Sequence, residues 1–472
     1  MHPSSLYGEY SVGSFGKEGF EFVDFLYECG FSVWQTLPFC MTDEFNSPYK
    51  SPASFSLNPF FIDLPTLSES GYISDSELKS ARQKNEYRCE FERLKSQRIP
   101  LLFKAAERAM SDKVVAGKVS EFIFKNPRID AASKFLALKS EYGDVPFQKW
   151  EKREPSEREA DKWRFLNYEF YRQWQCLKSY ANKKGIEIMG DLPIYVSEDS
   201  ADVWEFPESF LLDAKGYPLE VAGVPPDYFS ADGQLWGNPI YNYGLMERDG
   251  FSWWKERIRF AFSLFDSVRI DHFRGLDAYF SIPIGKSARE GKWKEGPGAS
   301  LVSALREESG EKKLIAEDLG IIDGSVRELM QRFSLPGMRV FEFAFLDGSD
   351  SEHLPHNYNK DTVAYTGTHD NNPLLAYLFE CSPGERSLIF DYCGYGGTDI
   401  DEAVRYIVRA MMASSAGTVI FPIQDILGHG RDTRMNTPSV CEGNWGYRIT
   451  EGQLDRVDRK GLRALCETYK RI

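Results

Sequence analysis

The sequence lacks the usual marks of a secreted, membrane-bound or nucleic-acid-binding protein. Its 8 cysteines are scattered without a CxxC pair, so neither a zinc site nor a disulfide framework is indicated, and reduced thiols in the cytoplasm fit best. There is no signal-peptide pattern, and no apolar run approaches the roughly 18 residues that a membrane span needs. Lys and Arg number 57 against 71 Asp and Glu, and this acidic balance disfavours nucleic acid and anionic membranes as partners. We therefore expect a cytoplasmic protein.

Catalytic motifs of several common enzyme classes are missing as well. The sequence has no GxSxG elbow, no P-loop and no HExxH. No glycine-rich phosphate turn follows an early strand, which weakens the case for an open, doubly wound sheet. What the sequence does have is 42% hydrophobic residues, enough for a large core, and 14% aromatic residues. Most of these rings should fill the core, although ring faces also suit sugars.

Glycine is nearly absent from one long segment. Only Gly117 and Gly143 fall between positions 72 and 184, although the chain has 38 glycines. Lys, Glu, Arg, Ala and Leu dominate there, with apolar residues at helical spacing, and a capping-box pattern runs from Ser156 to Glu159. We expect a helical insertion over residues 72–160.

Short β-prone runs make up a different pattern in the rest of the chain. One lies at 31–39, and six more follow Gly185, most of them separated by helix-like segments. This spacing predicts parallel strands with crossover helices. Polar residues follow several runs: Asp191, Asp271 and His272, Glu317 and Asp318, His369 and Asp370, Gln424 and Asp425. Polar clusters at the ends of successive strands are typical of the active-site face of a TIM (β/α)₈ barrel. The fold prediction is therefore an α/β protein, a single catalytic barrel over residues 1–472 with inserted, mostly helical subdomains.

The run SVRIDHFRG carries the first candidate for chemistry. Arg269 and Asp271 lie two residues apart in a strand and so point the same way. Such a pair is more often structural than catalytic. However, the neighbouring arginine should lower the pKa of Asp271, and an ionised aspartate suits a nucleophile.

Two further carboxylates complete a possible set. Glu317 follows an apolar run, which should raise its pKa and keep it protonated for a leaving group, while Asp318 projects to the opposite side. Asp370 lies in TGTHDNN, where a turn or capping role would be the first interpretation of the triplet alone. Together, an ionised Asp, a proton-carrying Glu and a third Asp resemble a glycosidase set.

Histidines flank two of these aspartates. His272 and His369 are two of only 6 in the chain. A metal site is one interpretation, but neutral histidines that bind sugar hydroxyls explain the pattern equally well, and no other ligand set is evident. We expect neither a metal nor an organic cofactor.

With these residues in hand, the chain resembles the 4-α-glucanotransferases of the amylomaltase (disproportionating enzyme) family, in the α-amylase clan. A dozen motifs in family order carry the resemblance: HPSSL, WQTLP, SPYKSPASFSLNPFFIDL, GIEIMGDLPIYV, PPDYFSADGQLWGNPIYN, RIDHFRGL, IAEDLG, PGMRVFEFAF, YTGTHDNN, QDILG, RMNTP and NWGYR. They span nearly the whole chain.

The resemblance implies a role for each candidate residue. Asp271 would attack the glucosyl C1, Glu317 would be the general acid/base, and Asp370 would stabilise the transition state. The residues that would bind malto-oligosaccharides and other α-1,4-glucans are Tyr49, Asp191, Trp236, Asn238, Arg269 and His369. A loop-rich insertion over residues 200–250, including VPPDYFSADGQ at 224–234, would cover the cleft and disfavour water.

Two alternatives stay open at this stage: an α-amylase-clan hydrolase, and a non-catalytic glucan-binding protein, which would need a lost carboxylate. One departure from the family pattern concerns the start. His2 follows Met1 directly, whereas the family's first barrel strand precedes this histidine. Either the start is misassigned or the barrel lacks that strand, and we favour the former because a missing strand leaves edge groups unpaired. The oligomeric state is not readable from the sequence.

Overall fold

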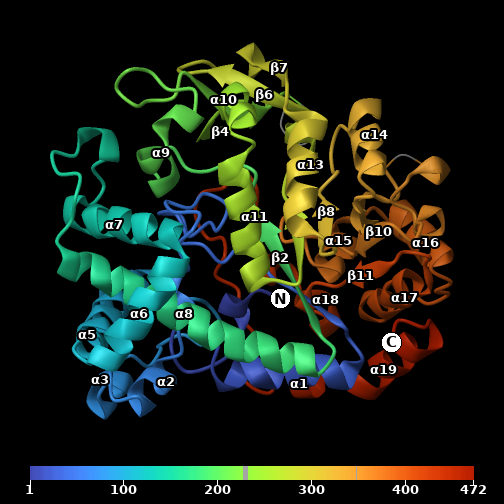
Figure 1. Cartoon of the computed structure of the whole chain (residues 1–472). Helices are drawn as coiled ribbons and strands as arrows, with labels where there is room; N and C mark the ends of the chain where they lie inside the picture. The colour runs from blue at the N-terminus through green and yellow to red at the C-terminus, as the bar shows by residue number, and fades with distance from the viewer. Residues whose placement is uncertain (227–231, 347) are drawn as a thin grey trace.

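The computed structural model describes residues 1–226, 232–346 and 348–472, and parallel strands form its centre (Figure 1). One sheet has the order β1 (Val33–Gln35), β2 (Glu187–Leu192), β5 (Ser267–Ile270) and β8 (Lys313–Ala316). A second has β9 (Gly337–Val340), β10 (Thr362–Tyr365) and β11 (Thr418–Ile420). All neighbours within these two sheets are parallel. Each strand lies in one of the predicted β-prone runs, so that prediction is confirmed.

The two sheets are joined where β8 lies beside β9, and in the part of the chain that the structure describes they are not joined between β1 and β11. The N–H of Ala316 in β8 donates to the Pro336 carbonyl just before β9, at 2.9 Å. On the other side, β1 and β11 are edge strands within the described ranges. Their residues line a shared pocket with Met1, whose ammonium group donates to the Gln35 carbonyl at 3.2 Å. The parallel α/β architecture is therefore confirmed, whereas the predicted closed barrel of eight strands is not seen in the described residues.

Helices connect the successive parallel strands, as is usual for crossovers, except that only short 3₁₀ turns lie between β9 and β10 in the described residues. In chain order these connections are α8 (Glu157–Lys183), α11 (Ser252–Leu264), α13 (Gly298–Ser309), α14 (Gly324–Arg332) and α17 (Ile400–Ala413). Aromatic rings fill the space beneath them: Trp174 of α8 is fully buried, and its ring lies 4.7 Å from that of Phe39 and 5.1 Å from that of Phe15. These aromatic rings thus belong to the main hydrophobic core, as expected.

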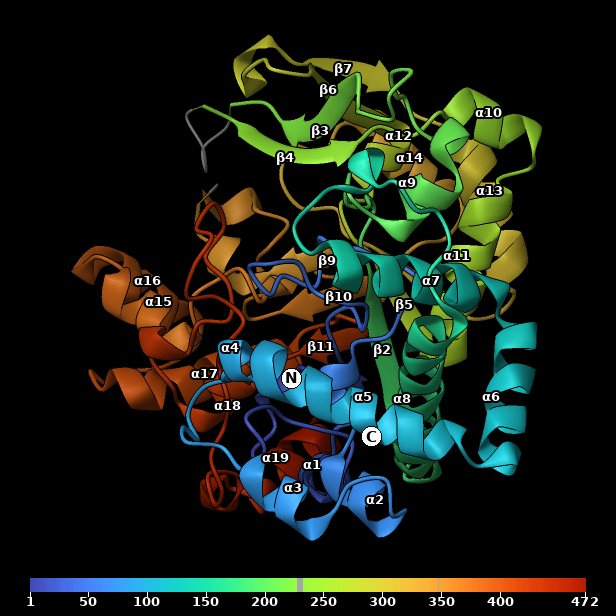
Figure 2. The same cartoon turned by 90° about the vertical axis from the view of Figure 1, so that its left-hand side faces the viewer.

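The glycine-poor segment is helical. It contains α3 (Asp75–Ser80), α4 (Phe91–Arg93), α5 (Ile99–Met110), α6 (Lys113–Lys125) and α7 (Pro127–Tyr142), all between β1 and β2. Figure 2 shows α5 and α6 beside the long α8. The Ser156 side chain caps α8 by accepting from the Glu159 N–H. The helices expected over 72–160 are therefore confirmed, while their separate status as an insertion stays a prediction.

The segment over 200–250 is more regular than the sequence indicated. It contributes β3 (Glu220–Val224) and β4 (Gln234–Pro239) to an antiparallel sheet of order β4-β3-β6-β7, together with β6 (Ala278–Pro283) and β7 (Lys292–Glu295). Because β3 pairs with β6 across more than fifty residues of chain, no local turn signal marks this pairing. The segment thus contains strands and short helices as well as loops, and its role as an insertion that covers the cleft stays a prediction.

The remaining helices lie mostly on the outside of the molecule. They are α1 (Lys17–Cys29), α2 (Leu64–Glu69), α9 (Ala201–Glu205), α10 (Tyr243–Arg248), α12 (Arg274–Asp277), α15 (Leu374–Glu380), α16 (Pro383–Tyr392), α18 (Ile423–Leu427) and α19 (Arg459–Thr468). In the described parts of the chain, no helix combines the length and the apolar character needed to cross a membrane.

Candidate active site

The three candidate carboxylates follow the ends of three parallel strands. Asp271 comes directly after β5, Glu317 directly after β8, and Asp370 lies in the loop after β10. Carboxyl ends of parallel strands meet at one face of such a fold. The negative charges of Glu317 and Asp370 both raise the pKa of Asp271, so the three groups are close enough to interact electrostatically.

Arg269 is shared between two aspartates. Its Nη2 lies 3.1 Å from Asp271 Oδ1, but its Nη1 lies 2.7 and 2.8 Å from the two carboxylate oxygens of Asp191. The neighbouring strands β2 and β5 place Asp191 directly opposite Arg269. The Tyr49 hydroxyl donates to Asp191 Oδ2 at 2.6 Å. Three predicted sugar-binding residues, Tyr49, Asp191 and Arg269, therefore form one hydrogen-bonded chain.

Sharing Arg269 has a consequence for the pKa of Asp271. Burial raises the pKa of Asp271 from 3.8 to about 8, and the Arg269 charge opposes this shift without cancelling it. The expected low pKa of Asp271 is therefore not found: Arg269 does lower this pKa, but burial and the negative charges of Asp191, Glu317 and Asp370 outweigh its effect. Burial also raises the pKa of Glu317, so the two carboxyl groups titrate as an interacting pair.

Glu317 is fixed by backbone donors. The His272 N–H donates to Glu317 Oε2 at 2.6 Å, and the Leu319 N–H donates to Oε1 at 3.2 Å. The next residue, Asp318, points elsewhere as predicted: its Oδ2 lies 2.8 Å from Arg339 Nη1, and it is 6% exposed. Asp318 is thus structural, and Glu317 is the glutamate available for chemistry.

Asp370 lies among aromatic and amide side chains. The Asn436 amide donates to Asp370 Oδ1 at 2.6 Å, and His369 Nε2 lies 3.4 Å from Asp370 Oδ2. The Tyr49 ring stacks on His369, with centroids 5.0 Å apart and planes 12° apart. Trp445 packs beside both rings. Burial lowers the pKa of His369, so this histidine is neutral near pH 7 and able to hydrogen-bond a hydroxyl.

The antiparallel sheet reaches the site through β4. The Trp236 ring meets His272 edge-on, with centroids 4.9 Å apart, and burial lowers the pKa of His272 to about 4. Asn238, another predicted sugar-binding residue, is 7% exposed, and its amide donates to the Val196 carbonyl at 2.7 Å. The structure therefore places Trp236 next to the residue after Asp271, and shows Asn238 engaged with the backbone.

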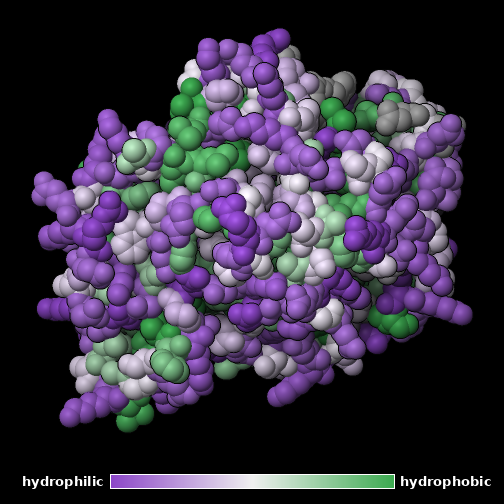
Figure 3. All heavy atoms as spheres, turned by 45° about the horizontal axis from the view of Figure 1, so that its top comes forward, coloured by the Kyte–Doolittle hydropathy of each residue, from purple (hydrophilic) through white to green (hydrophobic). Residues whose placement is uncertain are grey.

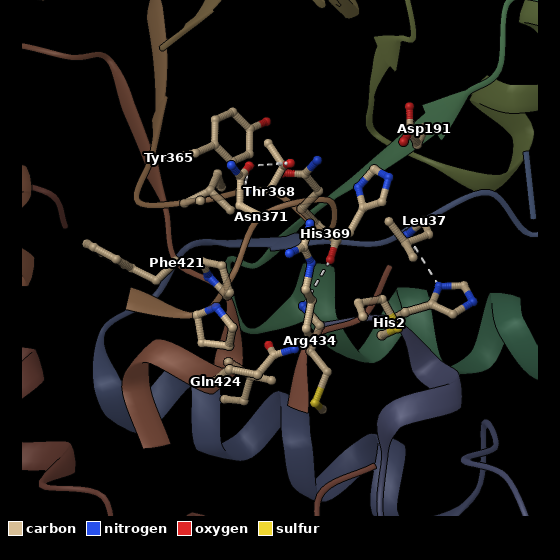
Figure 4. A pocket seen from close by; sticks show the side chains of 18 of the residues that line it. His2, Leu37, Asp191, Tyr365, Thr368, His369, Asn371, Phe421, Gln424 and Arg434 are labelled. Atoms are coloured by element: carbon tan, nitrogen blue, oxygen red, sulfur yellow. Dashed lines mark hydrogen bonds between the residues drawn. The ribbon is translucent and has the colours of Figure 1, made fainter. Parts of the chain in front are cut away.

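A pocket opens beside this cluster (Figure 4). Asp191, Arg269 and His369 line it together with His2, Gln424 and Arg434. His2 is neutral because burial lowers its pKa to about 3, and its Nδ1 accepts from the Leu37 N–H at 3.3 Å. The pocket thus presents both charged groups and neutral hydrogen-bonding groups.

One face of the molecule is mixed in character (Figure 3). Most of the face in Figure 3 is hydrophilic, with hydrophobic patches among the polar groups. Large apolar side chains exposed on or next to the antiparallel sheet are Leu219, Leu235, Ile284 and Trp293. Of the cleft-covering loop predicted at 224–234, residues 227–231 lie outside the described residues.

Sequence reasoning missed several residues that the structure brings to the site. Arg434, Asn436 and Trp445 surround Asp370 and His369. All three lie in the motifs RMNTP and NWGYR, so the signal was present, but no strand or charge pattern connected these motifs to Asp370. In the described ranges, no group of three or more His, Cys, Asp or Glu side chains is arranged to hold a metal ion.

Comparisons with known proteins agree on one family. A family model described as 4-alpha-glucanotransferase matches residues 1–454. The 4-alpha-glucanotransferase of Thermus thermophilus is 39% identical, over 100% of this chain and 98% of that protein. That of Clostridium butyricum is 38% identical over 100% of both. Among solved structures, the amylomaltase from Streptococcus agalactiae in complex with acarbose matches with a TM-score of 0.94 at 35% identity, covering 100% of this chain and 98% of that chain.

Proposed function

The chain belongs to the 4-alpha-glucanotransferase family, and we propose that Asp271, Glu317 and Asp370 carry out its transfer of α-1,4-glucan segments between malto-oligosaccharides. The observation that carries this assignment is the electrostatic cluster of three carboxyl groups delivered by β5, β8 and the loop after β10. The enzyme is a 4-α-glucanotransferase, and the open question is which atoms do the chemistry.

In the first step, a carboxylate oxygen of Asp271 attacks the anomeric C1 of the donor glucan. The bond from C1 to the glycosidic oxygen breaks, and Glu317 gives its proton to that oxygen, so the leaving glucan departs with a free 4-hydroxyl. The product is a glycosyl ester on Asp271. The step needs a proton on Glu317 and a negative charge on Asp271 at the same time, and burial raises the pKa of both groups.

In the second step, the 4-hydroxyl of an acceptor glucan attacks C1 from the face that the first leaving group vacated. Glu317, now a carboxylate, accepts the hydroxyl proton, and the ester bond to Asp271 breaks. Two inversions at C1 restore the α-configuration. The His272 and Leu319 N–H groups hold the Glu317 carboxylate during this half-reaction.

The sugar that reacts is held by the groups around the carboxylates. Asp370 bonds its ring hydroxyls, and Arg269, Asp191 and the neutral His369 supply further hydrogen bonds. Tyr49 and Trp236 offer ring faces to the sugar. Asn238 contributes by holding the backbone at Val196, in the segment that follows β2. Acarbose is bound by the Streptococcus agalactiae amylomaltase, and it is a suitable probe of this subsite in the present chain.

The larger architecture serves the same purpose in this proposal. The seven parallel strands in the described residues are arranged as in a (β/α)₈-type catalytic barrel that is open between β1 and β11. The helical segment 72–160 and the segment 200–250 are additions to it, and the latter covers the cleft and disfavours water. A cytoplasmic location fits the 8 cysteines, all of which are free.

Incubation with maltotriose tests the proposal. A transferase yields glucose together with oligomers longer than the substrate, whereas a hydrolase yields mainly glucose and maltose. Asp271→Asn, Glu317→Gln and Asp370→Asn should each abolish formation of the longer oligomers while leaving the protein folded. Full disproportionation by Asp271→Asn would overturn the mechanism, and a product mixture without longer oligomers from the unaltered chain would favour the hydrolase.

A further inference from the structure

The loop that carries His369 and Asp370 is held at both of its ends by one buried carboxylate. This loop, residues 366–373, connects β10 to α15 and is called the Asp370 loop below. Asp425 Oδ2 accepts from the Thr366 hydroxyl at 2.6 Å, and Asp425 Oδ1 accepts from the Leu374 N–H at 2.7 Å. Asp425 is 4% exposed. One side chain therefore ties the residue that opens the loop to the residue that follows it.

The tip of the loop is held by the same segment of chain. The Arg434 guanidinium donates to the Asp370 carbonyl, and to Asn372 Oδ1 at 3.0 Å. The Asn436 N–H donates to the His369 carbonyl at 3.0 Å, and the Asn436 amide reaches Asp370 Oδ1 at 2.6 Å. In Figure 4, Arg434 lies directly beneath His369. Arg434 and Asn436, which lie later in the chain than β11, thus contact both the backbone of the loop tip and the Asp370 carboxylate.

The segment 423–436 is itself internally braced. Gln424 donates through its amide to the Thr433 carbonyl at 3.0 Å, and the His429 N–H donates to the Gln424 carbonyl at 2.8 Å. Asp425 and Asn436 are therefore parts of one folded unit. A shift at Asp425 would be felt at both the base and the tip of the Asp370 loop.

The loop has little room on its other side. A Cβ on Gly367 would lie 2.8 Å from Glu342 Oε1 and 3.2 Å from the Asn371 Cβ. Glu342 is 8% exposed, and its N–H donates to the Thr366 carbonyl at 3.3 Å. The loop is thus enclosed between Glu342 and Asp425, so its position depends on how these two side chains pack.

We propose that Asp425 is a positioning residue for the reaction: with Arg434 and Asn436 it fixes the Asp370 loop so that Asp370 and His369 face the reacting sugar. This inference rests on the proposed function of Asp370. Asp425 touches no substrate in this scheme and acts only through the loop. The reason for a buried carboxylate here is that it accepts from two donors at once and leaves neither unpaired, which an apolar residue cannot do.

The first test compares Asp425→Ala with Asp425→Asn. Alanine removes both contacts, whereas asparagine keeps both, since its carbonyl accepts from the Leu374 N–H and its amide donates to the Thr366 hydroxyl. With maltotriose we expect Asp425→Ala to lower kcat by about 100-fold, the loss typical of a misplacement of about 1 Å, with a much smaller change in KM. Asparagine should restore most of the activity. The control is Asp432→Ala, an exposed aspartate in the same segment, which should match the unaltered enzyme.

Hydrogen–deuterium exchange of the amides over 366–374 provides a readout independent of sugar chemistry. Asp425→Ala should speed exchange across this loop and weaken acarbose binding, and Asp425→Asn should do neither. If Asp425→Ala does not fold, Thr366→Val removes only the contact at the start of the loop and should give the same changes in smaller measure. A folded Asp425→Ala with unaltered kcat, or with unaltered exchange over 366–374, would overturn the inference.

The two proposals fail in different ways. If Asp370→Ala keeps full activity, the proposed role of Asp370 is wrong, while faster exchange in Asp425→Ala would still show that Asp425 holds the loop. If Asp370→Ala is inactive and Asp425→Ala is unchanged in both rate and exchange, the positioning role is wrong and the proposed function stands.

Discussion

The backbone N–H of His272 donates to Glu317 Oε2 at 2.6 Å, and His272 holds a left-handed backbone with φ of 45°. This turn follows Asp271 immediately, so a single change of chain direction places the nucleophile on one side and directs an amide to the acid/base on the other. Non-glycine residues adopt this region at a cost of about 1–2 kcal/mol, and the half-buried imidazole of His272 packs edge-on against Trp236.

His272→Asn and His272→Val separate backbone geometry from side-chain chemistry. Asparagine tolerates the left-handed region, whereas a β-branched residue does not. We expect His272→Asn to keep most of the kcat and His272→Val to lose about tenfold or more, in line with about 1–2 kcal/mol of added strain. Steady-state kinetics with maltotriose makes the comparison. Equal losses in the two variants would show that the imidazole, and not the turn, is what matters.

Arg269→Gln should shift the pH dependence of the enzyme. The Arg269 charge lowers the pKa of both Asp271 and Glu317, so its removal raises both. Since Asp271 must be ionised to attack, the acid limb of kcat/KM should move to higher pH. Arg269→Lys keeps the charge and should leave the limb near its original position, although it loses the double contact with Asp191.

The Arg269→Gln variant should also be less stable than the unaltered protein. Arg269→Gln leaves Asp191 buried without its cation, so its unfolding free energy should fall by about 3–5 kcal/mol, which urea denaturation measures. An acid limb that stays in place in Arg269→Gln, or that moves to lower pH, would show that Arg269 does not set the ionisation of the pair.

Asp271→Asn should become relatively more stable as the pH rises. The pKa of Asp271 is about 8 in the folded protein against an ordinary value of 3.8. The folded state therefore binds the proton more tightly than the unfolded state, and the aspartate costs more stability as pH rises from about 4 to about 8. Asparagine has no such cost, so its advantage in urea unfolding should be larger at pH 8 than at pH 5.

Asp425→Asn is the matched comparison for that experiment. Burial raises the pKa of Asp425 to about 6, so the advantage of asparagine at 425 should level off by about pH 7, whereas that at 271 continues to grow. An advantage at 271 that shrinks with rising pH would contradict a raised pKa for the nucleophile.

Gly190→Ala tests the packing beneath Asp191. A Cβ at this position in β2 would lie 2.1 Å from the buried ring of Phe265, so the ring or the strand has to move, at a cost of about 1–3 kcal/mol. Gly117→Ala in α6 is the control with the opposite sign: nothing lies within 4 Å of its Cβ, and alanine should stabilise the helix by about 0.5–1 kcal/mol. Urea denaturation measures the free energy of unfolding of both variants. An unchanged free energy of unfolding in Gly190→Ala would show that β2 is not closely packed against Phe265.

The sequence was sufficient for the parallel strands and for the three carboxylates at their ends. Each strand is a short β-prone run, and the residues that directly follow β5 and β8 are the carboxylates Asp271 and Glu317. Local pattern carries this information. The opposite orientations of Glu317 and Asp318 likewise followed from strand alternation alone.

What the sequence did not reveal depends on contacts between distant segments. The pairing of β3 with β6 and the sharing of Arg269 between Asp191 and Asp271 both join residues far apart in the chain. The raised pKa of Asp271 likewise depends first on burial and then on the charges of Asp191, Glu317 and Asp370, which local sequence pattern does not show. Asp425 was recognised only as a polar residue after a strand, because nothing local shows that it lies buried beneath the loop of another strand.

Trapping of the covalent intermediate tests the central claim most directly. In Glu317→Ala, an α-glucosyl fluoride needs no acid to lose fluoride, so the first step proceeds, while the second step lacks its base and the glycosyl-enzyme accumulates. Peptide mass spectrometry should then find one added glucosyl residue on the peptide that contains Asp271, and none in the double variant that also carries Asp271→Asn. An adduct on another carboxylate, or inverted glucose released with no adduct, would contradict the assignment of Asp271 as the nucleophile.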